Sequence, residues 1–236
     1  ADIALGFETA TSFENATIAR RGASGWRVET KGKRAHSSGV FNENIGAGAI
    51  FEMSRILNAF YEEVRGEEYL TFNPGTLLGG TFVDYDKQTS SGEVFGKTNV
   101  VAQTAVVNGG LRFISEEQKE NARAKMRAIV SQNLPQTSAS IRFADSYPAM
   151  GPTAGNQAVL EVLSDVSQDL GFGPVTGYDP SRRGAADISF VADYIDGLDG
   201  LGTMGNGAHT PQETVNLKTM NALIQRAAVL IYRLSR

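Results

Sequence analysis

Between residues 25 and 145, hydrophobic and polar positions follow the period of a strand in some stretches and that of a helix in others. The spacing predicts six elements in the order strand, helix, strand, strand, helix, strand. They lie at residues 25–33, 45–64, 69–80, 99–113, 115–134 and 138–145. The polar residues around Gly92 predict a loop between the two middle strands. This order is that of a split βαβ module, and it predicts an antiparallel sheet with two helices on one face.

The flanking segments have a different pattern. Residues 1–7 alternate like a strand, and residues 159–170 and 217–234 each show one apolar helical stripe. Gly171 is expected to close the first of these helices and Asn216 to cap the second. The segment 195–205 predicts one more strand that leaves through a glycine loop.

The flanks therefore predict an α/β domain with too few strands for a complete sheet. The simplest architecture is a ferredoxin-like βαββαβ module inserted in this incomplete α/β domain. We place the boundaries at residues 1–20, 21–146 and 147–236, with the inserted module in the middle.

Composition narrows the functional classes. The chain has 236 residues, 41 % hydrophobic and 20 % charged, as is ordinary for a soluble globular protein. Its net charge of −4 favours neither a nucleic-acid nor a membrane partner. The absence of cysteine excludes thiolate zinc sites, cysteine nucleophiles and disulfides, and leaves both cytoplasm and periplasm open as compartments.

The segment GNGAHTPQETVN carries His209, one of only two histidines. Glycines at 205 and 207 let the backbone bring an imidazole to a crowded site, and a neutral imidazole is a common zinc ligand. An exposed loop histidine is the plainer interpretation. Glu8 follows the first predicted strand, where ligand-contacting groups gather in α/β sheets, although most such glutamates are simply solvated.

Four further residues have both a functional and a plain interpretation. His36, in the basic turn KGKRAHSSG, could donate a hydrogen bond to an oxyanion or bond a loop carbonyl. Arg112, thirteen residues after Asn99, could clamp a carboxylate or form a salt bridge at the sheet edge. Asp187 in RRGAAD could orient a ligand, but capping the following helix is the default. No complete catalytic set and no metalloprotease, esterase or phosphate-loop motif is present.

Taken together, these segments resemble the zinc exopeptidase family of aminoacylases and glutamate carboxypeptidases. GFETA is similar to the family's S-F-E-P-T segment, and KGKRAHSSG to its G-K-x-x-H turn. TNVVAQTAVVNGGLRF is similar to its S-N-[IV]-[IV]-P…D-x-R strand pair. GAHTPQETV resembles its G-x-H-x-x-x-E-x-[IV] segment, and RRGAAD the G-G-[ST]-D run before it. The βαββαβ module corresponds to the family's lid and dimerisation domain.

The resemblance implies a role for each residue. Glu8 would bind one zinc ion and His209 the other, with two zinc ions in each active site of the full-length parent. His36 would reach across a homodimer, formed through the lid domain, and help to polarise the scissile carbonyl as a catalytic group. Asn99 and Arg112 would bind the terminal carboxylate or backbone groups of a peptide or N-acyl amino acid. The implied reaction is hydrolysis of that amide bond, of carboxypeptidase or aminoacylase type.

The family's histidine-aspartate pair, bridging aspartate and Glu-Glu pair precede the segment that Glu8 matches. We therefore expect this chain to be the C-terminal half of the enzyme, not to bind zinc tightly and to be inactive alone. Gly109-Gly110 and the alanines of RRGAAD also depart from the family pattern. Two alternatives stay open, namely a non-catalytic dimerisation module and a small-molecule binding protein that keeps the Arg112 clamp.

Overall fold

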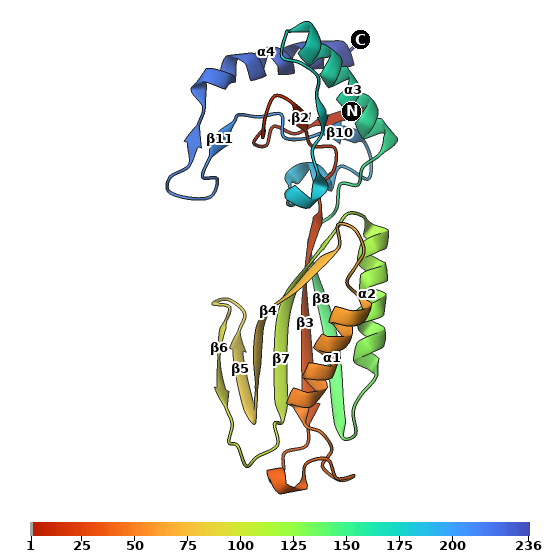
Figure 1. The fold of residues 1–236 in the computed structure, drawn as a ribbon, viewed down its shortest axis with the longest axis vertical. Coiled ribbons are helices and arrows are strands. Elements are labelled where there is room, and N and C mark those ends of the chain that lie inside the picture. Colours follow the sequence, from red (N-terminus) through yellow and green to blue (C-terminus); the bar gives the residue numbers. More distant parts are fainter. Residues whose placement is uncertain (1) are drawn as a thin grey trace. The chain divides into compact units, whose positions relative to one another are not determined.

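The computed structural model describes residues 2–236; Ala1, where the first predicted strand begins, lies outside the described residues. The chain forms two compact units (Figure 1). Unit 1 holds the residues up to Ala23 together with Ile114–Glu116 and Tyr147–Arg236, and unit 2 holds Ser24–Phe113 and Glu117–Ser146. Each unit has its own sheet and helices, so each is described by itself.

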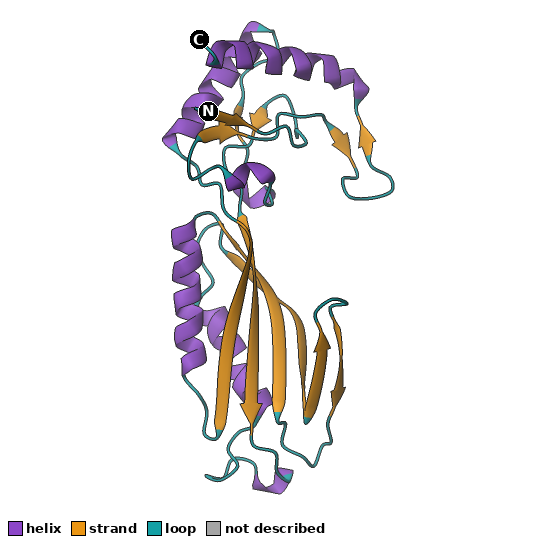
Figure 2. Cartoon of the chain, turned by 180° about the vertical axis from the view of Figure 1, so that it is seen from behind, coloured by secondary structure: helices purple, strands orange, loops and turns teal. Residues whose placement is uncertain are grey.

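Unit 2 is built on a four-stranded sheet in the order β4-β7-β3-β8. Its strands are β3 (Gly22–Gly32), β4 (Thr71–Gly80), β7 (Thr104–Phe113) and β8 (Thr137–Tyr147). The helices α1 (Ala49–Glu63) and α2 (Glu116–Ser131) cover the same face of this sheet (Figures 1 and 2). The strands β4 and β7 pair antiparallel. The predicted ferredoxin-like βαββαβ module is therefore confirmed.

The core of unit 2 lies between this sheet and its two helices. Alternate residues of β3 are buried, as the period of two requires for a sheet with one covered face. Trp26 from β3 meets Phe60 of α1 edge to face, with ring centroids 5.7 Å apart. Met126 of α2 is also fully buried. The apolar helix faces predicted from the sequence are therefore the faces that pack against the sheet.

Helix α1 begins four residues later than predicted. Gly46 and Gly48 have φ angles of +71° and +81°, in the left-handed region that glycine adopts without strain. This backbone carries Ile45 in a turn instead of a helix, and the helix starts at Ala49. Ile45 is apolar and fits the helical spacing, but it does not belong to the apolar face of α1.

The predicted loop around Gly92 is wrong. The segment forms a hairpin of β5 (Phe82–Asp86) and β6 (Ser91–Phe95), paired antiparallel from Phe82↔Phe95 to Asp86↔Ser91. All five residues of β6 are exposed. Neither strand buries a regular apolar face, so the hydrophobic alternation that reveals other strands is missing here.

Unit 1 has a minimal sheet, as predicted. The strand β1 (Ile3–Leu5) pairs in parallel with β10 (Asp196–Leu198), and no further strand joins this pair among residues 2–236. Two-residue pairs join β2 (Asn15–Ala16) to β9 (Thr176–Gly177) and β11 (Gly205–Asn206) to β12 (Thr214–Val215). The helices are α3 (Ala154–Asp169) and α4 (Leu217–Leu234).

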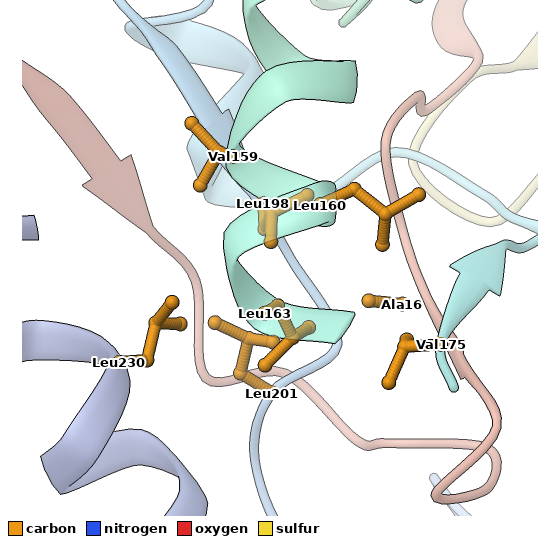
Figure 3. Close-up of a cluster of buried hydrophobic side chains, with 8 residues drawn as sticks. All are labelled: Ala16, Val159, Leu160, Leu163, Val175, Leu198, Leu201 and Leu230. Atoms are coloured by element: carbon orange, nitrogen blue, oxygen red, sulfur yellow. The ribbon is translucent and has the colours of Figure 1, made fainter. Parts of the chain in front are cut away.

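The core of unit 1 gathers apolar residues from both helices and from the strand pair. Figure 3 shows Leu230 of α4 facing Leu163 of α3 and Leu201. Leu198, at the end of β10, belongs to the same cluster and is fully buried. These contacts hold the β1–β10 pair against the two helices.

Both helix-end predictions in unit 1 are confirmed. Asn216 caps α4 through its side-chain oxygen, which accepts from the Lys218 amide at 3.1 Å. Gly171 follows α3 with φ of +78°, and the Phe172 amide donates to the Ser167 carbonyl at 2.8 Å. Within residues 2–236 no helix is long and apolar enough to cross a membrane.

Glu52 is a carboxylate with no exposed surface in the core of unit 2. It accepts hydrogen bonds from Arg55 at 2.6 Å, from the Leu134 amide at 2.8 Å and from the Thr137 hydroxyl at 3.0 Å. Burial would raise the pKa of Glu52, but these bonds outweigh it and hold the pKa below its ordinary value. Glu52 thereby ties α1 to the turn that enters β8.

We predict that Glu52→Gln lowers the free energy of unfolding of unit 2 by about 2–3 kcal/mol, because it leaves Arg55 without its buried charge partner. The single tryptophan, Trp26, lies in unit 2, so its fluorescence during urea denaturation reports this unit. Since the folded pKa is depressed, the stabilisation is complete above the ordinary glutamate pKa and is lost as pH falls through the folded value. Glu62→Gln, on the exposed face of the same helix, should change stability little, and equal effects of the two changes would contradict this role.

Candidate metal and substrate site

Glu8 follows β1 on a segment that runs beside the continuation of β10. Past the paired strands, the Leu201 amide donates to the Gly6 carbonyl at 3.1 Å and the Gly202 amide to the Glu8 carbonyl at 2.9 Å. The Ala10 amide then donates to the Thr203 carbonyl at 3.1 Å. Glu8 is therefore fixed at the carboxyl end of two parallel strands, with its side chain exposed.

Glycine is required where these two segments touch. A Cβ atom on Gly6 would lie 2.4 Å from Oδ1 of Asp199, and one on Gly202 would lie 2.1 Å from the Phe7 carbonyl oxygen. No side chain fits in such a space, so the close approach depends on both glycines. The sequence signal was present in GFETA and LGTMG, but spacing alone did not show that they touch.

His209 lies in the loop that joins β11 to β12. Its φ angle is +64°, in the left-handed region that non-glycine residues seldom adopt. Hydrogen bonds of the Thr210 hydroxyl to the Gly207 carbonyl, at 2.7 Å, and of the Gln212 amide to that hydroxyl, at 3.2 Å, fix the loop. The imidazole is exposed. Only the short run from Thr203 to β11 separates this loop from the segment paired with Glu8.

The donor chemistry of these two residues suits zinc, which binds imidazole nitrogen and carboxylate oxygen. Neither side chain makes a hydrogen bond or ion pair with any other part of the described chain, so both are available as ligands. Two donors are nevertheless fewer than a tetrahedral site needs. Over residues 2–236, moreover, no group of three or more potential ligand side chains lies together.

A buried ion pair lies against the Glu8 segment. Asp199, which has no exposed surface, accepts from Nε of Arg20 at 2.7 Å. Arg183 donates to the Thr9 carbonyl at 3.0 Å, immediately after Glu8 in the sequence. Burial, followed by the charge of Arg20, lowers the pKa of Arg183, while Asp199 and Glu8 act in the opposite direction.

Arg20 pairs with the buried Asp199 carboxylate, and Arg183 lies near enough to feel the charges of both. In the described structure Nη2 of Arg20 and Nε of Arg183 are buried without a hydrogen-bond partner. This arrangement places two guanidinium groups beside the Glu8–Thr9 backbone, near the Asp199 and Glu8 carboxylates. No sequence motif indicates either arginine as part of the site, although the RRGAAD segment contains Arg183.

Asp187 does not cap the helix that follows it. Ala186 occupies the N-cap position of the short 3₁₀ helix Asp187–Phe190, and no side chain bonds its free amides. Asp187 lies one residue too late for capping, so the default interpretation of this residue was wrong. Its carboxylate is exposed in the first turn.

His36 and Asn99 lie together in unit 2. The Ser37 amide donates to the Asn99 carbonyl at 2.9 Å, and the Val101 amide donates to the Ala35 carbonyl at 2.9 Å. Nδ1 of His36 accepts from the Ser38 amide at 3.2 Å. A neutral imidazole with Nδ1 as acceptor carries its proton on Nε2, which is then available as a donor.

Arg112 lies at the other end of this region. It pairs with Thr71 near the end of β7. Eight residues separate it from Thr104, where β7 begins, and they correspond to about 27 Å along a strand. Within unit 2 the structure therefore groups Asn99 with His36 and not with Arg112. The guanidinium of Arg112 is exposed and forms no ion pair with any described residue, so the sheet-edge salt bridge is absent from residues 2–236.

Comparison with known proteins gives two kinds of match. The peptidase dimerisation domain matches residues 18–138, just over half of the chain. Among solved structures, aminopeptidase PepT from Bacillus cereus is 18% identical, with a TM-score of 0.75 over 100% of this chain and 58% of that protein. A tripeptidase from Staphylococcus aureus is 19% identical, with a TM-score of 0.69 over 98% of this chain and 56% of that protein.

A third solved structure is the YXEP protein from Bacillus subtilis, described as a dinuclear metal binding peptidase from the M20 family. It is 15% identical, with a TM-score of 0.64 over 98% of this chain and 56% of that protein. At these identities the likeness shows the fold. The chain thus spans a little over half the length of the structures that it matches. No curated protein matches it.

We predict that Asp199→Asn destabilises unit 1, because it leaves Arg20 buried beside Arg183 without a counter-charge. A loss of about 3 kcal/mol corresponds to roughly hundredfold faster amide hydrogen exchange in α3 and β10. Mass spectrometry of peptides from these elements measures it. Asp193→Asn, at an exposed position of the same unit, should leave the exchange unchanged. Wild-type exchange rates in Asp199→Asn would show that the ion pair does not hold this segment.

Proposed function

The chain belongs to the M20 peptidase family, whose dimerisation domain it contains, and on that premise we propose that the whole protein hydrolyses a peptide or N-acyl amide bond at a metal centre. Unit 1 supplies Glu8 and His209 as metal ligands. The single observation that supports this most is the pairing of the Glu8 segment with residues 198–203, because that strand continues directly into the His209 hairpin.

The metal is proposed to be zinc, as two ions in each active site. A metal pair, when bound, lowers the pKa of a water molecule and stabilises negative charge on the carbonyl oxygen. Glu8 and His209 would each hold one ion. We propose that the remaining ligands come from outside these 236 residues, so that this chain alone binds zinc weakly and does not catalyse.

Unit 2 contributes groups that bind the substrate. His36 and Asn99 act as one cluster, in which Nε2–H of His36 donates to the developing oxyanion and helps to polarise the scissile carbonyl. We propose that this cluster serves the active site of the partner in a homodimer. Arg112 acts apart from it and binds a substrate carboxylate through two parallel N–H bonds.

The substrate class has two candidates. The site residues suit a carboxypeptidase or aminoacylase that acts on N-acyl amino acids or short peptides with a free carboxylate. The solved structures described as an aminopeptidase and a tripeptidase favour a short peptide with a free amino group as the second candidate. Comparing a tripeptide with its N-acetylated form separates the two, since only the aminopeptidase needs the free amine.

A non-catalytic role is the alternative from another class. The matched domain comprises most of unit 2, which could act as a dimerisation module with no hydrolytic duty. The whole protein discriminates between the two, because a module would bind no metal and hydrolyse neither substrate.

We expect Glu8→Gln and His209→Ala to reduce kcat of the zinc-loaded whole protein by at least about a thousandfold, since each removes a metal ligand. Both positions are exposed, so stability should be unaffected. Zinc content after dialysis, measured by mass spectrometry, should fall in both variants. Glu14→Gln, an exposed carboxylate in the same region, is the matched control and should keep both activity and zinc. Full zinc content in Glu8→Gln would remove Glu8 from the site.

Mixing two inactive variants of the whole protein tests whether His36 acts across the dimer. Glu8→Ala lacks a metal ligand and His36→Ala lacks the carbonyl donor, but their heterodimer contains one site with both groups intact. After subunit exchange, half of the dimers are heterodimers, so activity should return to about a quarter of the wild-type value. A mixture that stays as inactive as its components would show that His36 does not serve the partner's site.

A further inference from the structure

The side chain of Arg183 supports the backbone segment that carries Glu8. The Glu8 carbonyl accepts a backbone hydrogen bond from the Gly202 amide at 2.9 Å. The Thr9 carbonyl takes no part in the backbone bonds of the strand pair and accepts instead from Nη2 of Arg183 at 3.0 Å. Among the described residues, no other side chain forms a hydrogen bond with residues 7–10. The segment is thus held by a neighbouring backbone and by one guanidinium group.

The guanidinium of Arg183 is itself confined. A Cβ atom on Gly200 would lie 2.8 Å from Nη2 of Arg183, so the group lies directly against the Gly200 backbone. The guanidinium carbon lies 5.1 Å from the centroid of the Tyr178 ring, within the range of a cation–π contact. Nε of the same side chain is buried. Because these contacts restrict the side chain, its bond to Thr9 restrains the backbone at that position.

Arg183 also joins the two strands of the central pair. Thr9 lies beyond the end of β1 and Gly200 lies beyond the end of β10, so one guanidinium contacts the continuation of both strands. The next residue is anchored as well, since the Gly184 carbonyl accepts from Nη1 of Arg20 at 3.3 Å. Arg183 therefore connects the RRGAAD segment to both strands at the candidate site.

The neighbouring Arg182 differs from Arg183 in this contact. Its guanidinium carbon also lies near the Tyr178 ring, 5.8 Å from the centroid. Arg182 is exposed, however, and within residues 2–236 it forms no hydrogen bond with the segment that carries Glu8. Two adjacent arginines with the same charge and the same aromatic neighbour can therefore be compared, and only one of them bonds to Thr9.

We propose that Arg183 is a positioning residue of the metal site, which fixes the backbone at Glu8 through its bond to the Thr9 carbonyl. This inference rests on the proposed role of Glu8 as a metal ligand and extends it. The Glu8 carboxylate is exposed and has no hydrogen bond of its own to orient it, so its direction depends on the backbone. Replacing a residue that orients a metal ligand typically weakens metal binding by about 10–100-fold.

Charge and position predict opposite effects when Arg183 is replaced. A guanidinium is a permanent cation, so its charge beside the Glu8 segment repels a zinc ion. The loss of this charge alone would strengthen zinc binding. The loss of the bond to Thr9 weakens zinc binding, because the Glu8 segment must then become ordered when the metal binds. The direction of the change therefore distinguishes the two effects.

The zinc affinity of the whole protein, measured by competition with chelators of graded affinity, tests this role. Arg183→Gln should raise the zinc dissociation constant by about 10–100-fold, whereas Arg182→Gln should not raise it. In a Glu8→Gln background, Arg183→Gln should add little further loss, because its effect passes through Glu8. Unchanged or tighter binding in Arg183→Gln, or a full additional loss in the Glu8→Gln background, would overturn the positioning role. Unchanged binding in Glu8→Gln alone would overturn the proposed function on which this inference rests.

Hydrogen exchange of the metal-free 236-residue chain tests the same bond without reference to zinc or hydrolysis. The amides of Ala10 and Gly202 bond between the Glu8 segment and its neighbour, and both should exchange at least about tenfold faster in Arg183→Gln. Amides in α3 should keep their wild-type rates, and Arg182→Gln should match the wild type throughout. Unchanged exchange at Ala10 would show that Arg183 does not hold the segment. Equal acceleration in α3 would show a general loss of stability in unit 1, and either result would overturn the inference.

Discussion

The parallel pairing of β1 with β10 is the constraint on which the account of the site depends. These strands come from opposite ends of the sequence, yet their hydrogen bonds continue beyond the strands to Glu8. Glycines at positions 6 and 202 permit the close contact, and the buried Asp199–Arg20 pair fixes the backbone beside it. The residues from 203 to 209 then need only a short hairpin to bring an imidazole into the same unit. One strand pair therefore brings the two proposed ligands, from distant segments, into one unit.

In unit 2, strand length divides the proposed substrate-binding groups. The segments that carry His36 and Asn99 are joined by backbone hydrogen bonds beyond the ends of β3 and β7, whereas Arg112 lies near the other end of β7. A rigid sheet holds such groups at a fixed separation, which one small substrate does not span. If both groups bind substrate, as proposed, they serve different copies of the site. This is the physical reason for considering a dimer.

Much of the fold was predictable from sequence because burial leaves a regular period. The βαββαβ order, the Asn216 cap and the Gly171 helix end all follow from such local signals. The β5–β6 hairpin was missed because its residues are largely exposed, so no apolar period marks it. The start of α1 was misplaced because Ile45 is apolar but precedes glycines with positive φ.

For the site, sequence motifs indicated Glu8, His36, Asn99, Arg112 and His209, but not which of them lie together. Arg20 and Arg183 were not predicted, because only the fold brings them close to Asp199.

The most direct test of the central claim is anomalous diffraction at the zinc edge from crystals of the zinc-loaded whole protein. We predict zinc within about 2.0–2.2 Å of a Glu8 carboxylate oxygen and of a His209 ring nitrogen. Zinc peaks with neither residue among their ligands would contradict the account.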